Sequence, residues 1–261
     1  MTGFFFKKAF FDGWDNFFPL MLMNLGYVLL VLAVLGVISL VLPAWAYLLA
    51  FAALGLVFSV YTGGVSGMAN RISRYSKENF KYFRQCVRRN LGHSVLHFLC
   101  IAVIVLGVSE IMPYYLQILP NTFGVILAGL VFWVVFFLAV ALQYYFPLAN
   151  LMPDDSPRKT LKKCFIVMFG NPGFSIFLFF YGVIDFALSV VLAFMIPGLA
   201  GVNLAYDVAL KLLMFKIDYL DANPDLDVRQ RRHIPWDDLL FDEKEKVGHR
   251  SLRNMIFPWK E

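Results

Sequence analysis

Long stretches without a charged residue limit what this chain can fold into. Residues 16–70 contain no Lys, Arg, Asp or Glu, and neither do residues 90–109, 111–153, 164–184 and 186–206. A helix of about 20 apolar residues crosses a hydrocarbon core roughly 30 Å thick, whereas each charge at its centre would cost about 2.5–3.5 kcal/mol. Composition agrees, because 60% of the 261 residues are hydrophobic and only 16% are charged. The sequence therefore predicts an all-α, polytopic integral membrane protein.

Six segments are long and apolar enough to span a bilayer. We expect them at about residues 17–42, 45–68, 92–112, 122–148, 173–196 and 199–219. They would form one transmembrane domain over residues 1–220, with an interfacial amphipathic helix at about 71–90. Residues 221–261 are rich in charge, and we expect them to form a cytoplasmic tail.

The basic residues predict how these segments are oriented. Every Lys and Arg except Lys211 lies at the same end of the expected spans. Because cytoplasmic loops are enriched in Lys and Arg, we expect both termini in the cytoplasm and a multi-pass chain in the cell membrane, the inner membrane of a bacterium. The net charge of +5 then points to anionic lipid headgroups, and not to nucleic acid, as the partner of this face.

Two short stretches of the sequence echo each other. Residues 90–98 read NLGHSVLHF and residues 171–179 read NPGFSIFLF, and each follows a basic run and opens a long apolar run. Asn16 opens the first span in a comparable way. The odd-numbered spans each end at a proline, namely Pro43, Pro113 and Pro197. Since proline lacks an amide hydrogen and suits a helix end, the pattern predicts three helical hairpins related as internal repeats. Convergent use of Asn and Pro at interfacial helix ends is the alternative interpretation.

The segment between the second and third spans has an amphipathic pattern. Its basic residues recur every three or four positions, as on one face of a helix: Arg74, Lys77, Lys81, Arg84 and Arg88. Phe80, Phe83 and Val87 fall on roughly the opposite face. We expect this helix to lie in the membrane interface, with its aromatic side chains in lipid and its cations at lipid headgroups. Simple anchoring and recognition of a specific lipid or anionic substrate both fit the pattern.

The start of the chain and its first basic loop together resemble a pattern found in a family of membrane proteins. A Gly3-Phe4-Phe5 start is followed by two apolar spans and by the stretch FKYFRQCVRRN at residues 80–90. In this respect the chain resembles the YesL-type family of small polytopic bacterial membrane proteins, some of which accompany carbohydrate-uptake genes. The resemblance extends over residues 3–220 and implies a fold of several membrane helices. It implies no catalytic residues, because no activity is firmly assigned to that family.

Three ionisable residues interrupt the last two spans. Asp185 lies roughly midway along the fifth span, and Lys211 follows Asp207 by one helical turn in the sixth. If these spans form a hairpin, all three residues lie at similar depth, so that Lys211 can meet either carboxylate. Charges inside a membrane are costly and often functional. We expect either a neutralised cluster that fixes helix packing or a proton- or ion-coupled substrate site.

Other polar side chains do not combine into a reactive centre. His93 and His97 stand one turn apart, but the sequence offers no third metal ligand, and we expect them to pack at the interface. The glycine-rich stretch 62–67 lacks the lysine of a phosphate loop and is expected to allow close helix packing. The three cysteines fall in cytoplasmic or membrane segments, where disulfides are not expected. No pairing of a nucleophile with a base is evident, so we expect no metal, no other cofactor and no enzymatic activity.

Two tryptophans in the tail, Trp236 and Trp259, stand in matching contexts, each after an apolar residue and a proline. We expect them to dock the tail, either on the chain's own cytoplasmic face or on a membrane or cytoplasmic protein partner. Two functional classes follow. One is an accessory or scaffold subunit of a larger membrane system, which works by packing and tail contacts. The other is a small transporter or permease component that uses Asp185, Asp207 and Lys211.

Overall fold

The computed structural model describes residues 1–76, 79–119, 121–192, 197–227, 229–248 and 250. All regular structure in these residues is helical, as the apolar composition predicts. The elements are α1 (Thr2–Asp15), α2 (Phe17–Ser39), α3 (Ala44–Ser73), α4 (Phe80–Arg89), α5 (Leu91–Leu106), the π-helix η1 (Gly107–Ile111), α6 (Met112–Ile118), α7 (Thr122–Leu142), α8 (Tyr145–Leu151), α9 (Pro157–Gly170), α10 (Pro172–Val191), α11 (Gly198–Ala222), the 3-10 helix η2 (Gln230–Arg232), α12 (Trp236–Leu239) and α13 (Phe241–Val247).

Within the described residues, six helical segments are long and apolar enough to cross a membrane, which confirms the six expected apolar helices. They are Phe17–Ser39, Ala44–Ser73, Leu91–Ile118, Thr122–Leu151, Pro172–Val191 and Gly198–Ala222. The second, fourth and sixth segments run a few residues further towards the charged end than expected. The amphipathic helix is shorter than the expected 71–90, because α3 continues to Ser73 and α4 begins only at Phe80.

Pro113 does not end the third span, contrary to the sequence prediction. A π-helical turn joins α5 to α6, and the span continues to Ile118. In this wide turn the backbone N–H of Met112 bonds to the carbonyl oxygen of Gly107. Pro113 then falls in the first turn of α6, where its missing amide hydrogen is tolerated.

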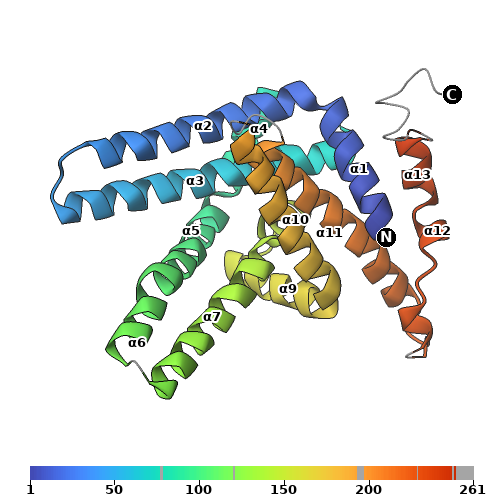
Figure 1. The fold of residues 1–261 in the computed structure, drawn as a ribbon. Helices are drawn as coiled ribbons and strands as arrows, with labels where there is room; N and C mark the ends of the chain where they lie inside the picture. The colour runs from blue at the N-terminus through green and yellow to red at the C-terminus, as the bar shows by residue number, and fades with distance from the viewer. Residues whose placement is uncertain (77–78, 120, 193–196, 228, 249, 251–261) are drawn as a thin grey trace.

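The chain repeats one arrangement three times: a short helix, an elbow at an asparagine and a helical hairpin (Figure 1). The short helices are α1, α4 and α9, and the asparagines are Asn16, Asn90 and Asn171. In the two echoed stretches, Ser94 and Ser175 each donate a hydroxyl hydrogen bond of 2.9 Å to the carbonyl oxygen of the elbow asparagine. The recurring sequence therefore has a recurring local structure.

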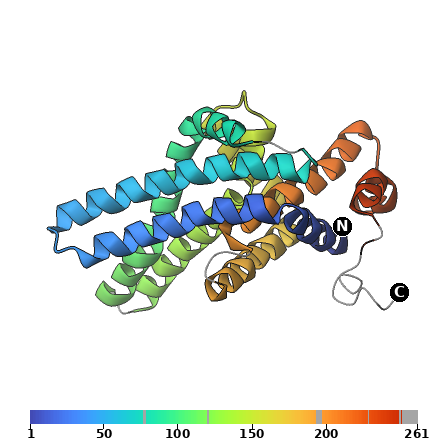
Figure 2. The same cartoon turned by 90° about the horizontal axis from the view of Figure 1, so that it is seen from above.

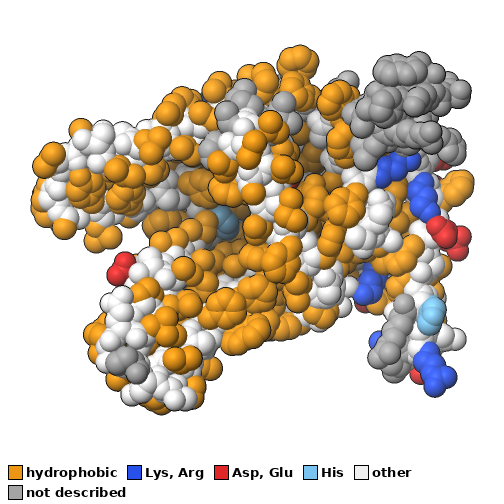
Figure 3. Space-filling model, in the orientation of Figure 1, with side chains coloured by type: hydrophobic (Ala, Val, Ile, Leu, Met, Phe, Trp, Pro, Cys, Tyr) orange, Lys and Arg blue, Asp and Glu red, His pale blue; other side chains and the backbone are white. Residues whose placement is uncertain are grey.

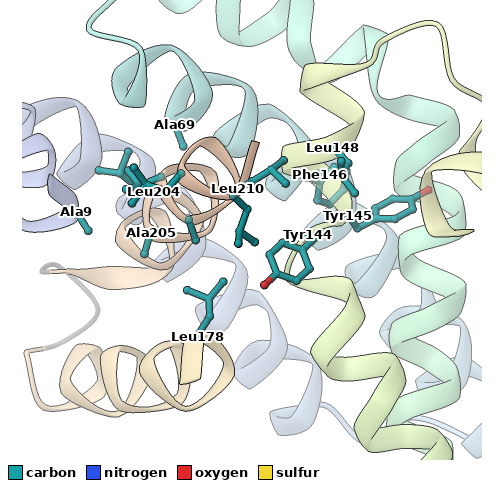
Figure 4. Close-up of a cluster of buried hydrophobic side chains, with 14 of the residues drawn as sticks. Ala9, Ala69, Tyr144, Tyr145, Phe146, Leu148, Leu178, Leu204, Ala205 and Leu210 are labelled. Atoms are coloured by element: carbon teal, nitrogen blue, oxygen red, sulfur yellow. The ribbon is translucent and has the colours of Figure 1, made fainter. Parts of the chain in front are cut away.

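Helix α11 is the central element of the bundle. Its most apolar window is 61% buried, against at most 28% for the other five spans. It packs against α2, α3 and α10, and Leu204, Ala205 and Leu210 lie in the core (Figure 4). A helix surrounded by protein does not need a wholly apolar surface. This explains why the span has the lowest mean hydropathy of the six, 1.4.

The molecule has an apolar end and a charged end. Two long arms, α2–α3 and α5–α7, project from a common base, whereas the α10–α11 hairpin stays nearer to that base (Figures 1 and 2). Apolar side chains cover both arms, and most of the visible charged side chains gather beside the C-terminal helices (Figure 3). This division into an apolar end and a charged end is the one expected of a protein whose arms lie in lipid and whose base lies in the membrane interface.

Candidate functional site

Lys211 is bound by the tail and not by the acidic residues of the spans. Its Nζ lies 2.8 Å from Oε1 of Glu243 in α13 and donates a 2.9 Å hydrogen bond to the carbonyl oxygen of Ser73. Within the described residues Lys211 makes no ion pair with Asp185 or Asp207, so the expected three-residue cluster does not form. The physical reason is that α11 runs on past the end of α3. Lys211 thereby reaches the charged end of the bundle, where the tail folds back.

Glu243 belongs to a cluster that we call the tail latch, formed by Lys8, Asp12, Tyr75, Lys211 and Glu243; Lys8, Asp12 and Glu243 are buried, whereas Tyr75 is 40% exposed. Lys8 Nζ lies 2.9 Å from Asp12 Oδ2 and 3.3 Å from Glu243 Oε2. The Tyr75 hydroxyl accepts a 2.7 Å hydrogen bond from Lys8 and donates one of 3.0 Å to Glu243. Lys8 is fully buried, and Glu243 is only 4% exposed. The latch therefore joins α1, the end of α3, α11 and α13 through two cations and two carboxylates.

Tyr75 stands at the centre of the tail latch in an unusual backbone conformation. Its φ is +61°, a left-handed value that side-chain-bearing residues rarely adopt. Lys8 Nζ lies 3.9 Å and Lys211 Nζ 4.9 Å from the centre of its ring, close enough for cation–π attraction. Such a conformation costs on the order of 1–3 kcal/mol, which the contacts of the ring and hydroxyl must offset.

The two carboxyl groups of the tail latch are shifted in opposite directions. Burial raises the pKa of Asp12 to about 6, although the charge of Lys8 lowers it in part. Burial also acts to raise the pKa of Glu243, but the hydrogen bond from Lys211 and the charge of Lys8 outweigh it and hold that pKa below its usual value. Glu243 is therefore the carboxylate that the two lysines stabilise most.

Asp207 is held by a separate polar network inside the bundle. Ser66 donates to its Oδ2 and Asn70 to its Oδ1, each at 3.0 Å. The network continues to a second hairpin, because Asn150 donates a 3.1 Å hydrogen bond to Ser66 and accepts one of 3.0 Å from Asn90. The residue is only 2% exposed. Asp207 therefore ties α11 to α3 and to the elbow before α5, as a fully bonded packing group.

Asp185 lies beside the first turn of α11. It is 9% exposed, and its carboxylate makes no hydrogen bond or ion pair within the described part of the chain. A Cβ atom at Gly201 would lie 3.8 Å from its Oδ2, so this glycine leaves room for the carboxylate. A negative charge near the N-terminus of a helix is favourable. We infer that Asp185 stabilises the start of α11 electrostatically.

The basic residues expected at lipid headgroups do lie on the surface. Arg74, Lys81, Arg84 and Arg88 are exposed, and Lys77 falls outside the described residues. The opposite face of α4 is not in lipid as expected, however. Phe83 and Val87 pack on Gly64 of α3, and Cys86 packs on Gly67, which confirms the close packing expected of the glycine-rich stretch. Phe80 is the exception, with 80% of its side chain exposed.

The two histidines point to different partners. His93 contacts Thr160 at 3.2 Å, and His97 contacts Ser59 at 3.1 Å. The described residues contain no group of three or more His, Cys, Asp or Glu side chains placed to hold a metal ion. All three cysteines are buried, and none of them forms a disulfide within the described residues.

The tail packs on the chain's own base. Trp236 packs against the hydrophobic core, and Leu240 and Val247 are each 1% exposed. Trp259 lies outside the described residues.

Sequence reasoning missed Glu243, which is hidden in the alternating run Asp242–Lys246, and it missed Lys8, Asp12 and Tyr75. The paired motifs Ala69-Asn70 and Ala149-Asn150 were a usable signal for the Asp207 network.

No family model matches the chain, and no curated protein and no solved structure is significantly similar to it. The resemblance to the YesL-type family therefore stays a prediction.

Proposed function

We propose that this protein is a non-catalytic accessory or scaffold subunit of a larger membrane system, placed in a bacterial inner membrane with both termini in the cytoplasm. The observation that supports this most is the ion pair between Lys211 and Glu243. It joins the transmembrane core to the tail. The chain thereby holds a small cytoplasmic element at a fixed place on a membrane-embedded frame.

The use of charge inside the bundle argues for a packing role. Asp207 accepts two hydrogen bonds from neighbouring helices, and Lys211 is neutralised by the tail. An ion-coupled site needs a charged group that changes partners between states. Asp207 and Lys211 instead have partners that hold the fold together. Breaking a buried pair is costly, about 3–5 kcal/mol, which suits a fixed joint better than a cycling one.

The outer face of the tail is the surface we assign to a protein partner. Phe241 is 65% exposed, and the Asp237 side chain is 97% exposed. The other face of the same segment is anchored by Leu240, Glu243 and Val247, each less than 5% exposed. A helix pair anchored on one face presents the other in a fixed orientation, which reduces the ordering cost of binding.

Mild-detergent affinity purification tests the proposal. The intact chain is compared with a chain that ends at Asp227 and with the variant Glu243→Gln, and co-purifying proteins are identified by mass spectrometry. We expect a stoichiometric partner with the intact chain, less of it with Glu243→Gln and none with the shortened chain. A monomer or homo-oligomer without a partner from all three would reject the scaffold role.

Transport is the second candidate function, and Asp185 is the residue that favours it. Unlike Asp207, it has no hydrogen-bond network as its partner within the described residues. Asp185→Asn separates the two functions. Normal amounts of folded protein with loss of uptake by cells would favour a transport site, whereas loss of folded protein would favour the electrostatic role at the start of α11.

A further inference from the structure

A third lysine at the charged end of the bundle differs from the two in the tail latch. Lys8 and Lys211 each have a carboxylate within 3.0 Å. Lys216, on another side of α11, makes no ion pair within the described residues, and its Nζ donates a 2.6 Å hydrogen bond to the neutral amide oxygen of Asn171. An ammonium group offers three donors. Two of them are left for another acceptor.

The space beside Lys216 is a cavity of about 500 Å³ between α1, α10, α11 and α12. Among the described residues that line it, Lys216 has the only charged side chain. Its apolar wall is formed by Phe174, Phe177, Leu213 and Trp236. The elbow at Asn171 and the first turn of α10 close it on one side. A hollow between the bundle and the C-terminal helices, with a Lys or Arg side chain in it, is visible in Figure 3.

We propose that this cavity binds an anionic phosphate group, supplied by the headgroup of a membrane phospholipid. Lys216 is half-buried and has no anionic partner within the described residues, so a phosphate would supply the charge-assisted hydrogen bonds that its ammonium group lacks. A phosphate oxygen can accept the two remaining Lys216 donors while the glycerol and upper acyl region lie on the aromatic wall. Tryptophan is typical of this boundary, where one side is apolar and the other wet.

The neighbouring surface favours the same class of ligand. Helix α9 leads into the elbow, and its exposed Arg158 would attract anionic lipids to this side, whereas Lys159 and Lys163 of the same helix are paired with Asp155. A second cavity on the other side of Lys216 contains both Arg231 and Asp221, whose charges offset each other. The proposal therefore concerns the first cavity alone, and it does not depend on the scaffold role.

Two variants test the charge of Lys216 and the volume of the cavity separately. Lys216→Gln removes the cation. Gly173→Leu fills the cavity while keeping the cation, and a Cβ atom at Gly173 meets no other atom within 4 Å, so the fold should tolerate it. Lys162→Gln is the matched control, because it removes one exposed lysine from the same surface.

Native mass spectrometry of the full-length protein in detergent measures the binding of phosphatidylglycerol, with phosphatidylcholine as the neutral-headgroup comparison. We expect phosphatidylglycerol to bind Lys216→Gln and Gly173→Leu about tenfold more weakly than the parent, and Lys162→Gln to bind it normally. If millimolar inorganic phosphate displaces the lipid and binds by itself, the site is supported with free phosphate as its source. Equal binding by all four proteins, or equal loss in Lys162→Gln, would overturn the site.

Discussion

Asn24 of α2 caps the first turn of α11: its Oδ1 accepts a 2.8 Å hydrogen bond from the backbone N–H of Ala200. Its Nδ2 donates a second bond of 2.8 Å to the carbonyl oxygen of Pro197. Asn24 lies seven residues after Phe17, or about 10 Å along α2, and α2 continues for about 22 Å beyond it. The start of α11 therefore lies beside the third of α2 that is nearest to the base, and not beside the tip of the first arm.

This relationship predicts that the third hairpin turns back inside the membrane. Residues 190–202 contain only apolar residues, proline and glycine, which suits a turn in hydrocarbon. Cysteines at Val41 and Val191 test the idea, since these side chains are 101% and 80% exposed. We expect a membrane-impermeant maleimide to label Val41→Cys from one side of the membrane and to leave Val191→Cys unlabelled from both. Labelling of Val191→Cys from the same side as Val41→Cys would mean that the hairpin crosses completely.

Gly198 and Asn24 should be energetically coupled. Gly198 has a φ of +67°, and a Cβ atom there would lie 2.1 Å from the side chain of Asn24. We expect Asn24→Ala to cost about 1–3 kcal/mol in detergent unfolding, because two backbone groups lose their partner. Gly198→Ala should cost more in the parent than in the Asn24→Ala protein, where only the backbone strain remains. Purely additive effects in this double-mutant cycle would contradict the close approach.

Glu243→Gln should release the tail. The substitution takes the carboxylate away from Lys211, while Lys8 keeps Asp12, and breaking a buried ion pair costs about 3–5 kcal/mol. We expect faster hydrogen exchange in α13 and faster proteolysis of the tail, with the apolar arms unchanged. Glu245→Gln is the control, because this exposed neighbour on the same helix should leave exchange as in the parent.

Titration of Asp12 should make the stability of the folded chain depend on pH. Its pKa in the folded chain is about 6, against 3.8 for an unperturbed aspartate. The folded state thus binds more protons than the unfolded state between about pH 4 and pH 6, and stability falls as pH rises through this interval. Asp12→Asn should remove that slope. Glu243 acts oppositely, because its lowered pKa gives stability that is present above its unfolded value and lost in stronger acid. A slope between pH 4 and 6 that persists in Asp12→Asn would contradict this assignment.

The sequence predicted the parts of the structure that depend on local chemistry. Charge gaps located the spans, and the Asn-x-Gly-x-Ser echo located two elbows, because both signals lie within one helix length. Partners such as Lys211 and Glu243 are 32 residues apart and lie in different elements. No periodicity connects them, so sequence reasoning assigned Lys211 to the nearest acids. The π-turn before Pro113 was likewise hidden, because it depends on how α5 and α7 pack.

The network around Asp207 gives a prediction about helix assembly. Asp207→Asn keeps a carbonyl oxygen for Asn70, and the Ser66 hydroxyl can rotate to accept from the new amide, so the cost should be near 1 kcal/mol. Asp207→Leu leaves both donors without an acceptor in a buried site, and we expect it to cost about 2–4 kcal/mol in detergent unfolding. Asn70→Ala in the Asp207→Leu background should then restore part of the loss, since it removes one of the orphaned groups. If Asp207→Leu is as stable as the parent, the network does not hold α11 against α3.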